Sequence, residues 1–254
     1  MHDGEPLVEA GLRIWRQVGR ATGAQAISLR VMEFAPGLSP TIQNDECDQI
    51  LYLLDDSASV GESDEVSITC GSGWFAIIDR QSYDVTPNTG VYIRPNQTFA
   101  INNSGAKAIT LISSQCPDPD RAPLFTTTTS ASSSPANDFS PVVRLADQKA
   151  QPTSDRWYRV LIDDRVGSTQ ATQFVGSIPP GRAPDHFHHY EEVLFILKGE
   201  GRMWAGESSA PIAAGSCIYL PKGQVHCVEN TGVGELRLLG VFYPAGSPSV
   251  RYEV

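Results

Sequence analysis

The chain has 254 residues and a mass of 27.5 kDa, enough for one large or two small domains. Hydrophobic residues make up 41% and charged residues 19%, a globular composition that excludes a largely disordered protein. The formal net charge of −10 argues against nucleic acid or an anionic membrane as partner, because both are bound through basic surfaces.

The N-terminus and the cysteines bear on where the protein resides. The first residues, MHDGEPLVEAG, are acidic and lack the apolar core of a signal peptide. No apolar run approaches the ~20 residues of a membrane helix. The five cysteines are widely spaced and form no CxxC pair, which disfavours a disulfide framework or a cysteine–zinc site. We expect a cytoplasmic protein with free thiols.

The first half of the chain is a series of short apolar segments separated by turns. Residues 1–24 are a lead-in for which a short helix and an edge strand are both open. An acidic, serine-rich insert at residues 55–67 is typical of a solvated loop. We expect strands at residues 25–34, 47–54, 74–78, 83–85, 91–94, 98–102 and 108–113. Strands this short, without convincing helices between them, predict an all-β barrel or sandwich.

A segment of low complexity then interrupts the strand pattern. It contains FTTTTSASSSPANDFSP, whose threonine, serine and proline content is typical of a linker. We therefore place an N-terminal domain at residues 1–116, a linker at 117–141 and a C-terminal domain at 142–254. In the C-terminal domain we expect strands at residues 157–162, 171–178, 192–198, 201–204, 216–220, 226–229 and 236–243.

The two halves resemble each other in the same order along the chain. The parallel segments are 26–37 with 170–181, 49–54 with 192–197, 70–75 with 198–203, and 90–97 with 216–223. Gly23 and Gly167 also match, and the main difference in length is the acidic insert of the first half. A duplicated β-barrel accounts for this collinear similarity.

Four of the five histidines lie close together in the second half. His186 and His188 are two residues apart, so on an extended strand both side chains point to the same face. Glu192 has the same parity and begins an apolar strand, so a turn can return its carboxylate to the pair. His226 lies downstream, after a proline–glycine turn. Three imidazoles and one carboxylate suit a divalent transition metal and leave positions open for water, substrate or dioxygen.

These ligand types do not distinguish among Mn, Fe, Ni, Co, Cu and Zn, so we expect one ion from this group. His189 has the opposite parity to its neighbour and is expected outside the ligand set. Three flanking residues are candidates for catalysis: Arg182 could hold a substrate carboxylate or phosphate, Asp185 could act as an acid or base, and Tyr190 is the third. The remaining positions on the inner face of the strand are apolar, which favours a partly apolar small molecule.

Two motifs in this region resemble those of the cupin superfamily. The segment from Gly181 to Gly199 resembles the first cupin motif, with four residues, where the family form has five, between its first glycine and first histidine. The second motif is matched at every fixed position, namely Gly215, Pro221, Gly223, His226 and Asn230. With the internal repeat, the chain resembles a two-barrel cupin, or bicupin.

The resemblance implies an all-β fold of two tandem jelly-roll barrels, with the metal inside the second. It implies ligand roles for four residues, His186, His188, Glu192 and His226. The first half departs from this pattern. Its candidate positions hold Gln43 or Ile42, Asp45 or Asn44, and Gln49 or Asp48, with Ala100 in place of His226 and Gln97 in place of the motif glycine. We expect the first barrel to lack the metal and to brace the second, or to bind something without metal.

The resemblance does not imply a single reaction, because cupins include dioxygenases, decarboxylases, isomerases, epimerases, lyases and non-catalytic binding proteins. The leading hypothesis is a metal-dependent, dioxygenase-like oxidoreductase acting on a small molecule, because a redox-capable ion with open positions can bind substrate and dioxygen together. The alternatives are a non-redox metal enzyme, such as an isomerase, decarboxylase or lyase, and a binding protein without turnover. We expect a monomer with internal pseudo-two-fold symmetry or a homodimer.

Overall fold

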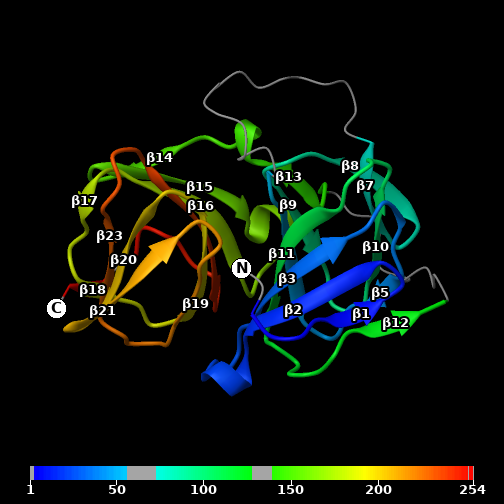
Figure 1. The fold of residues 1–254 in the computed structure, drawn as a ribbon, viewed down its shortest axis with the longest axis horizontal. Coiled ribbons are helices and arrows are strands. Elements are labelled where there is room, and N and C mark those ends of the chain that lie inside the picture. Colours follow the sequence, from blue (N-terminus) through cyan, green and yellow to red (C-terminus); the bar gives the residue numbers. More distant parts are fainter. Residues whose placement is uncertain (1–2, 56–72, 128–138, 251, 254) are drawn as a thin grey trace.

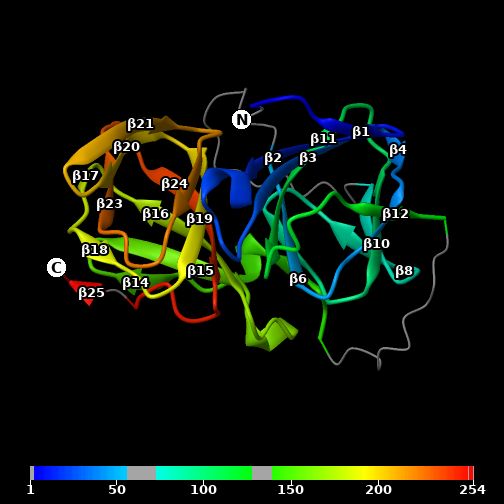
Figure 2. The same ribbon diagram turned by 90° about the horizontal axis from the view of Figure 1, so that it is seen from below.

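The computed structural model describes residues 3–55, 73–127, 139–250 and 252–253. Two antiparallel β-barrels lie side by side, the N-terminal one coloured from blue to green and the C-terminal one from green to red (Figures 1 and 2). The described helical segments are single 3₁₀ turns, η1 (Arg20–Thr22), η3 (Leu145–Asp147) and η4 (Asp164–Val166). The predicted all-β class with two tandem jelly-roll barrels is confirmed. No described helix has the length and apolar character needed to cross a membrane.

The N-terminal barrel is built from two sheets. Its strands are β1 (Leu7–Glu9), β2 (Leu12–Val18), β3 (Leu29–Phe34), β4 (Gly37–Leu38), β5 (Thr41–Gln43), β6 (Asp48–Leu53), β7 (Trp74–Ile78), β8 (Gln81–Val85), β9 (Thr89–Ile93), β10 (Thr98–Asn103), β11 (Ile109–Cys116), β12 (Leu124–Thr126) and β13 (Val142–Arg144). One sheet has the order β1-β2-β3-β11-β6-β9-β13 and the other β12-β5-β10-β7-β8, with β4 beside β10. The lead-in is therefore an edge hairpin, β1 and β2, and not a helix.

Two strands of the N-terminal barrel lie within the expected linker or directly after it. Strand β12 follows the N-terminal barrel's last long strand and pairs with β5, within the residues assigned to the linker. Strand β13 pairs with β9 of the N-terminal barrel, although the sequence places residue 142 at the start of the C-terminal domain. The middle of the linker and almost all of the acidic insert at 55–67 lie outside the described residues.

The C-terminal barrel repeats the arrangement. Its strands are β14 (Gln151–Thr153), β15 (Arg156–Ile162), β16 (Thr172–Ile178), β17 (Gly181–Arg182), β18 (His186–Phe187), β19 (Glu191–Lys198), β20 (Glu200–Ala205), β21 (Ser208–Ala213), β22 (Cys217–Leu220), β23 (His226–Asn230), β24 (Leu236–Tyr243) and β25 (Tyr252–Glu253). The sheet orders are β14-β15-β16-β24-β19-β22 and β21-β20-β23-β18-β25, with β17 beside β23. The sequence located the long strands to within a few residues, and its expected strands omit β14, β17, β18, β21 and β25, whose segments are short or polar.

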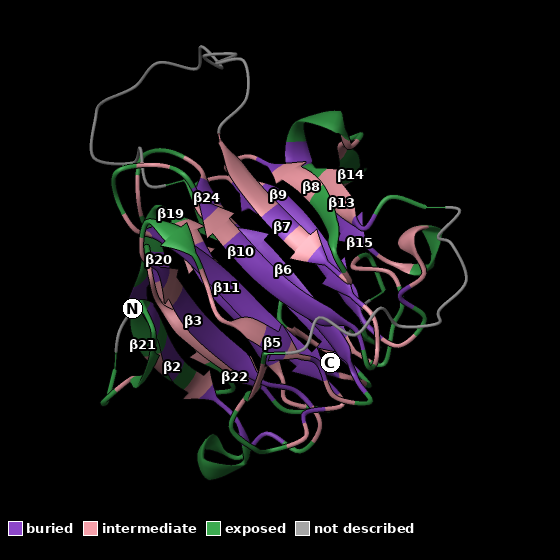
Figure 3. Cartoon of the chain, turned by 90° about the vertical axis from the view of Figure 1, so that its right-hand side faces the viewer, coloured by how far each residue is buried: buried purple, intermediate pink, exposed green. Residues whose placement is uncertain are grey.

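Apolar residues form one core inside each barrel and a third between the barrels. On β19, Leu194 and Ile196 belong to the interior of the C-terminal barrel, whereas Val193 and Phe195 pack against the N-terminal barrel. Both faces of this strand are buried, which explains its unbroken apolar run. The equivalent sheet of the N-terminal barrel is buried along most of β3, β11 and β6 (Figure 3). The barrels are thus joined by a continuous apolar layer.

Close strand contact at β20 gives a prediction about stability. A Cβ added at Gly201 would lie 2.0 Å from the carbonyl oxygen of Glu229 on β23, so the backbone would have to move. We expect Gly201→Ala to destabilise the protein by about 3 kcal/mol, the upper range for overpacking. Gly234→Ala is the matched control, because nothing lies within 4 Å of a Cβ there. Urea unfolding of both variants checks this, and equal stabilities would contradict it.

Candidate metal centre

Three strands of the C-terminal barrel bring the predicted ligands together. His186 on β18 pairs directly with His226 on β23, and His188 follows in the turn after β18. One ligand atom from each of these histidines lies within 4.8 Å of the other two. Glu192, near the start of β19, places Oε2 4.0 Å from Nε2 of His188. The four residues predicted as ligands therefore converge on one place, and their role as ligands remains a prediction.

Hydrogen bonds from the backbone orient two of the rings. Nδ1 of His186 lies 3.0 Å from the carbonyl oxygen of Pro184, and Nδ1 of His226 lies 2.8 Å from that of Gln224. A carbonyl oxygen can only accept, so in each neutral ring Nδ1 carries the proton and Nε2 is the nitrogen able to bind a metal. Such contacts fix the tautomer and the ring orientation of metal-binding histidines.

Burial sets the charge of these groups. It lowers the pKa of His188 to about 3 and that of His226 to about 4, and the neighbouring His186 adds to both shifts. It raises the pKa of Glu192 to about 8. Neutral imidazoles beside a carboxyl that resists ionisation form a site that a divalent cation fits, because the cation supplies the missing opposite charge. The donor set of nitrogen and oxygen suits first-row transition ions.

A stack of aromatic rings supports His188 from within the barrel. The ring of Tyr190 lies parallel to that of His188, with centroids 4.5 Å apart and an angle of 10°. The fully buried ring of Phe242 stacks on Tyr190 in turn, with centroids 4.3 Å apart and an angle of 18° between the rings. Glu192 pairs with Phe242 in the strand ladder between β19 and β24. Phe242 thus supports His188 through Tyr190 and lies opposite Glu192 in the sheet.

The four residues line a cavity of about 120 Å³ inside the C-terminal barrel. Most of its other walls are apolar, namely Phe174, Ile178, Leu194, Val228 and Leu238. One guanidinium, that of Arg156 at the start of β15, also lines it. The C-terminal segment contributes Pro248 to the lining, and β25 beyond it pairs with β18. The cavity therefore combines a polar centre, apolar walls and a single cation.

The predicted catalytic candidates lie in different places. Tyr190 lines the cavity, whereas Arg182 and Asp185 are not among the lining residues. The latter two form an ion pair at 3.2 Å with side chains 41% and 47% exposed. The guanidinium of Arg182 lies over the ring of Trp204, at 4.2 Å from its centroid. Hydrogen bonds to Cys227 and Arg182 lower the pKa of Asp185.

One histidine, His189, lies where the sequence predicted, and one arginine of the cavity, Arg156, was not predicted. His189, predicted outside the ligand set, is exposed and packs against Phe187 and Tyr252. Arg156 was missed, because it precedes an apolar strand far from the histidines in sequence, and no local pattern marks it.

The strand register of the N-terminal barrel shows which residues stand at the positions of the four candidate ligands. Gly37 pairs with Asn103 as Gly181 pairs with Asn230, which aligns the two barrels. The pair equivalent to His186 and His226 is then Ile42 and Phe99, which face each other between β5 and β10. Ala100, predicted at the position of His226, is wrong by one residue, because the turn between the motif proline and the strand is one residue shorter in the first barrel.

The other two positions hold amides in place of ligands. Gln49 pairs with Gln115 as Glu192 pairs with Phe242, so glutamine stands where the carboxylate is. Asn44 follows Ile42 by two residues, as His188 follows His186, and its side-chain amide donates to the backbone carbonyls of Cys47 and Arg94. Two apolar side chains and two amides do not make a transition-metal site.

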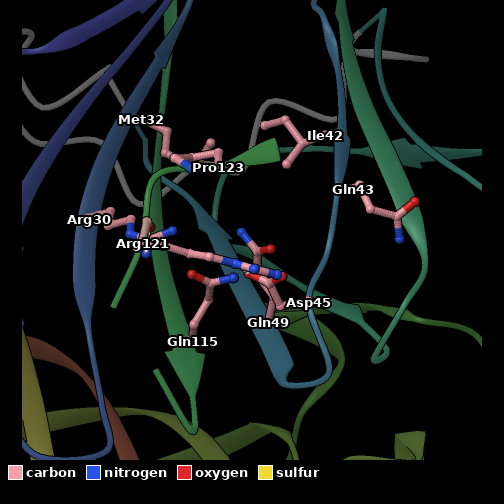
Figure 4. A pocket seen from close by; sticks show the side chains of 9 residues that line it. All are labelled: Arg30, Met32, Ile42, Gln43, Asp45, Gln49, Gln115, Arg121 and Pro123. Carbon is pink, nitrogen blue, oxygen red and sulfur yellow. Dashed lines mark hydrogen bonds and ion pairs between the residues drawn. The ribbon is translucent and has the colours of Figure 1, made fainter. Parts of the chain in front are cut away.

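The pocket beside Gln49, at the equivalent place inside the N-terminal barrel, is also much smaller. Its volume of about 10 Å³ holds roughly one water molecule, against about 120 Å³ in the other barrel. The side chain of Arg121 extends across it to form an ion pair with Asp45, beside Gln49 and Gln115 (Figure 4). At this place, the described residues of the N-terminal barrel offer neither the ligands nor the volume found at the equivalent place in the second barrel.

Comparison with known proteins finds a family match within the C-terminal barrel. Residues 174–242 match the model of the cupin domain. Auxin-binding protein 1 of Arabidopsis thaliana is 36% identical over 70 residues, 24% of this chain and 35% of that protein. An oxalate-binding protein of Thermotoga maritima is 38% identical over 66 residues, 25% of this chain and 54% of that protein. The chain thus spans between a third and about half of the length of these relatives.

Comparison of folds extends the similarity to both barrels. A variant of oxalate decarboxylase from Bacillus subtilis superimposes with a TM-score of 0.74 and 14% identity, over 96% of this chain and 76% of the other. Another structure of that enzyme, described with its Mn(II) centres, gives the same TM-score and coverage. At this identity the likeness concerns the fold alone. Residues 174–242 therefore match the cupin domain, and the chain as a whole shares the two-barrel fold of that decarboxylase.

Proposed function

We propose that the C-terminal barrel binds one divalent metal ion through His186, His188, Glu192 and His226 and decarboxylates a small carboxylic acid. The observation that carries this is the convergence of the three histidines and Glu192 in a cavity that also contains one guanidinium. The fold shared with oxalate decarboxylase and the sequence similarity to an oxalate-binding protein favour a carboxylate substrate. Manganese is the ion to test first, since that decarboxylase has Mn(II) centres.

The charges of the cavity bear on which carboxylate binds. Arg156 is the one cationic side chain among the lining residues that the structure describes. Its Nε pairs with Asp155 at 3.0 Å, and its other two nitrogens can hold one substrate carboxylate. The apolar walls favour a substrate with an apolar part, because they bury such a part at a gain of roughly 25 cal/mol per Å². A monocarboxylic acid with a short apolar group therefore fits this chain better than doubly charged oxalate does.

The residues of the barrel have distinct tasks in this reaction. A bound metal ion would act as a Lewis acid on an oxygen of the substrate. The apolar walls exclude water and strengthen the electrostatic contacts inside the cavity. When the bond to the carboxylate breaks and CO₂ leaves, the electron pair stays on the neighbouring carbon, which must take up a proton. Tyr190 lines the cavity and stacks on His188, so its phenol is our candidate donor. Burial and the nearby Glu192 raise its pKa, so the phenol is protonated before the reaction.

A dioxygenase-like reaction is the second candidate, because the same ligand set leaves positions for both substrate and dioxygen. Oxygen dependence separates the two. The protein loaded with Mn²⁺ is incubated with oxalate and with short-chain oxo- and hydroxy-monocarboxylic acids, with and without oxygen. CO₂ release without net oxygen consumption supports decarboxylation. Product formation that consumes dioxygen in proportion supports the dioxygenase, and ligand binding without turnover supports a binding protein.

The raised pKa of Glu192 gives a prediction about metal binding and pH. This carboxyl, with a pKa of about 8, must lose its proton to bind the ion, whereas His188 and His226 are already neutral above pH 5. We expect Mn²⁺ affinity to rise between pH 6 and pH 8, with about one proton released per ion. Calorimetry in two buffers of different ionisation enthalpy measures that proton. The Glu192→Gln variant should bind weakly and release none, and an unchanged proton count in it would contradict the assignment.

A further inference from the structure

A buried carboxylate on the C-terminal barrel reaches across to the N-terminal barrel. Glu191, the first residue of β19, is 8% exposed. Its two oxygens accept hydrogen bonds from the backbone N–H groups of Gln25, at 2.8 Å, and Ala26, at 2.6 Å, in the loop before β3. It also accepts a hydrogen bond from the hydroxyl of Tyr219 on β22. Charge-assisted hydrogen bonds of this kind are among the strongest in proteins.

The N-terminal barrel makes the same contact in the opposite direction. Asp48, the first residue of β6, is 2% exposed. It accepts a hydrogen bond of 2.8 Å from the hydroxyl of Tyr92 and one of 3.1 Å from the hydroxyl of Ser168, in the loop before β16. The backbone of Gln170 in that loop also hydrogen-bonds to it. Each barrel therefore inserts one carboxylate into a loop of the other.

The register of the sheets makes the two carboxylates equivalent. Asp48 pairs with Cys116, the last residue of β11, and Glu191 pairs with Tyr243, the last residue of β24. The tyrosines that donate to them stand on the equivalent neighbouring strands, β9 and β22. The two contacts are thus copies of one device, placed by the internal duplication at both sides of the barrel interface.

The copies differ in the residue that comes next. Glu191 is followed by Glu192 of the candidate metal centre, whereas Asp48 is followed by Gln49. Neighbouring residues of a strand point to opposite faces, so one carboxylate anchors the strand in the other barrel while the next faces the cavity. His188 lies three residues before Glu191, in the turn between β18 and β19. Glu191 therefore also fixes the end of the turn that carries His188.

We infer that the N-terminal barrel positions Glu192 and His188 for metal binding through its hydrogen bonds to Glu191. This rests on the proposed metal site and deepens it, because it gives the barrel without ligands a task in the other barrel's chemistry. Glu191 is a positioning residue: it is not a candidate ligand, and it is not among the residues that line the cavity. The Asp48 contact, which borders no ligand, serves the interface alone.

The equivalence supplies a matched pair of variants for the test. Glu191→Gln and Asp48→Asn each replace an accepting oxygen with an amide group that donates, and each weakens one of the two contacts. The measurements are the Mn²⁺ dissociation constant, from the electron paramagnetic resonance signal of free Mn²⁺, and the thermal midpoint. We expect both variants to lose thermal stability. Glu191→Gln alone is expected to weaken Mn²⁺ binding, by about tenfold, the lower end for groups that orient metal ligands.

The outcomes separate this inference from the proposed function. Equal Mn²⁺ affinities in the two variants and the wild type would overturn the inference and leave the metal site intact. A wild-type protein that binds no Mn²⁺ would overturn both. Where Glu191→Gln does not fold, Tyr219→Phe with Tyr92→Phe as its control removes only the donating hydroxyls. A loss of affinity confined to Tyr219→Phe then supports the inference, and equal affinities overturn it.

Discussion

The His188→Ala variant is expected to lose Mn²⁺ binding by at least about 100-fold. Nε2 of His188 lies 4.0 Å from Oε2 of Glu192, and the ring belongs to the group of three histidines, so its removal deletes one donor from the centre of the site. Changing a group that only orients a ligand costs 10- to 100-fold in affinity, and deleting the ligand itself costs more. The measurement is the Mn²⁺ dissociation constant of the folded variant.

His189→Ala is the control for this variant. It removes the same chemical group from the neighbouring residue, whose exposed side chain packs outside the cavity against Phe187 and Tyr252. Its Mn²⁺ affinity is expected to stay within about twofold of wild type. Strong binding by His188→Ala, or an equal loss in both variants, would contradict the assignment of His188 as a ligand.

Phe242→Ala is expected to damage both stability and metal binding. The side chain of Phe242 is fully buried and stacks on Tyr190, which in turn stacks on His188. Truncation of a buried phenylalanine costs about 3–5 kcal/mol, which for a chain of this length lowers the thermal midpoint by roughly 10 °C. Because Tyr190 loses its support, the ring of His188 gains freedom, and we expect Mn²⁺ affinity to fall by about tenfold.

Phe34→Ala separates these two effects. Phe34 is equally buried, in the core of the N-terminal barrel, and has no contact with the candidate metal centre. It should lose as much stability, measured by urea unfolding, while its Mn²⁺ affinity at 20 °C stays that of the wild type. A fall in affinity for Phe34→Ala as large as for Phe242→Ala would mean that general destabilisation, and not the ring stack, controls the site.

The sequence predicted the fold through patterns that depend only on local structure. The short strands, the repeat and the two motifs located both barrels, because side-chain alternation and turn glycines follow directly from strand geometry. The positions of His186, His188 and His226 could be predicted for the same reason. The spacing of two residues and the proline–glycine turn fix which way these side chains point.

What the sequence missed depends on register and on contacts between distant segments. Phe99, and not Ala100, faces Ile42, because one residue is missing from a turn, and only the strand ladder shows where. Arg182 and Asp185 lie beside the histidines in the chain, yet their side chains pair with each other and are not among the residues that line the cavity. The contact of Glu191 with the loop before β3 joins segments more than 160 residues apart and leaves no local pattern.

The central claim is that the second barrel holds one metal ion and the first holds none. Titration of the metal-free protein with Mn²⁺, followed by metal analysis after gel filtration, tests it most directly. We predict one Mn²⁺ ion bound per chain in the wild type and none in the variant in which His186 and His226 are both replaced by alanine. Two ions per chain, none, or one ion retained by the double variant would contradict it.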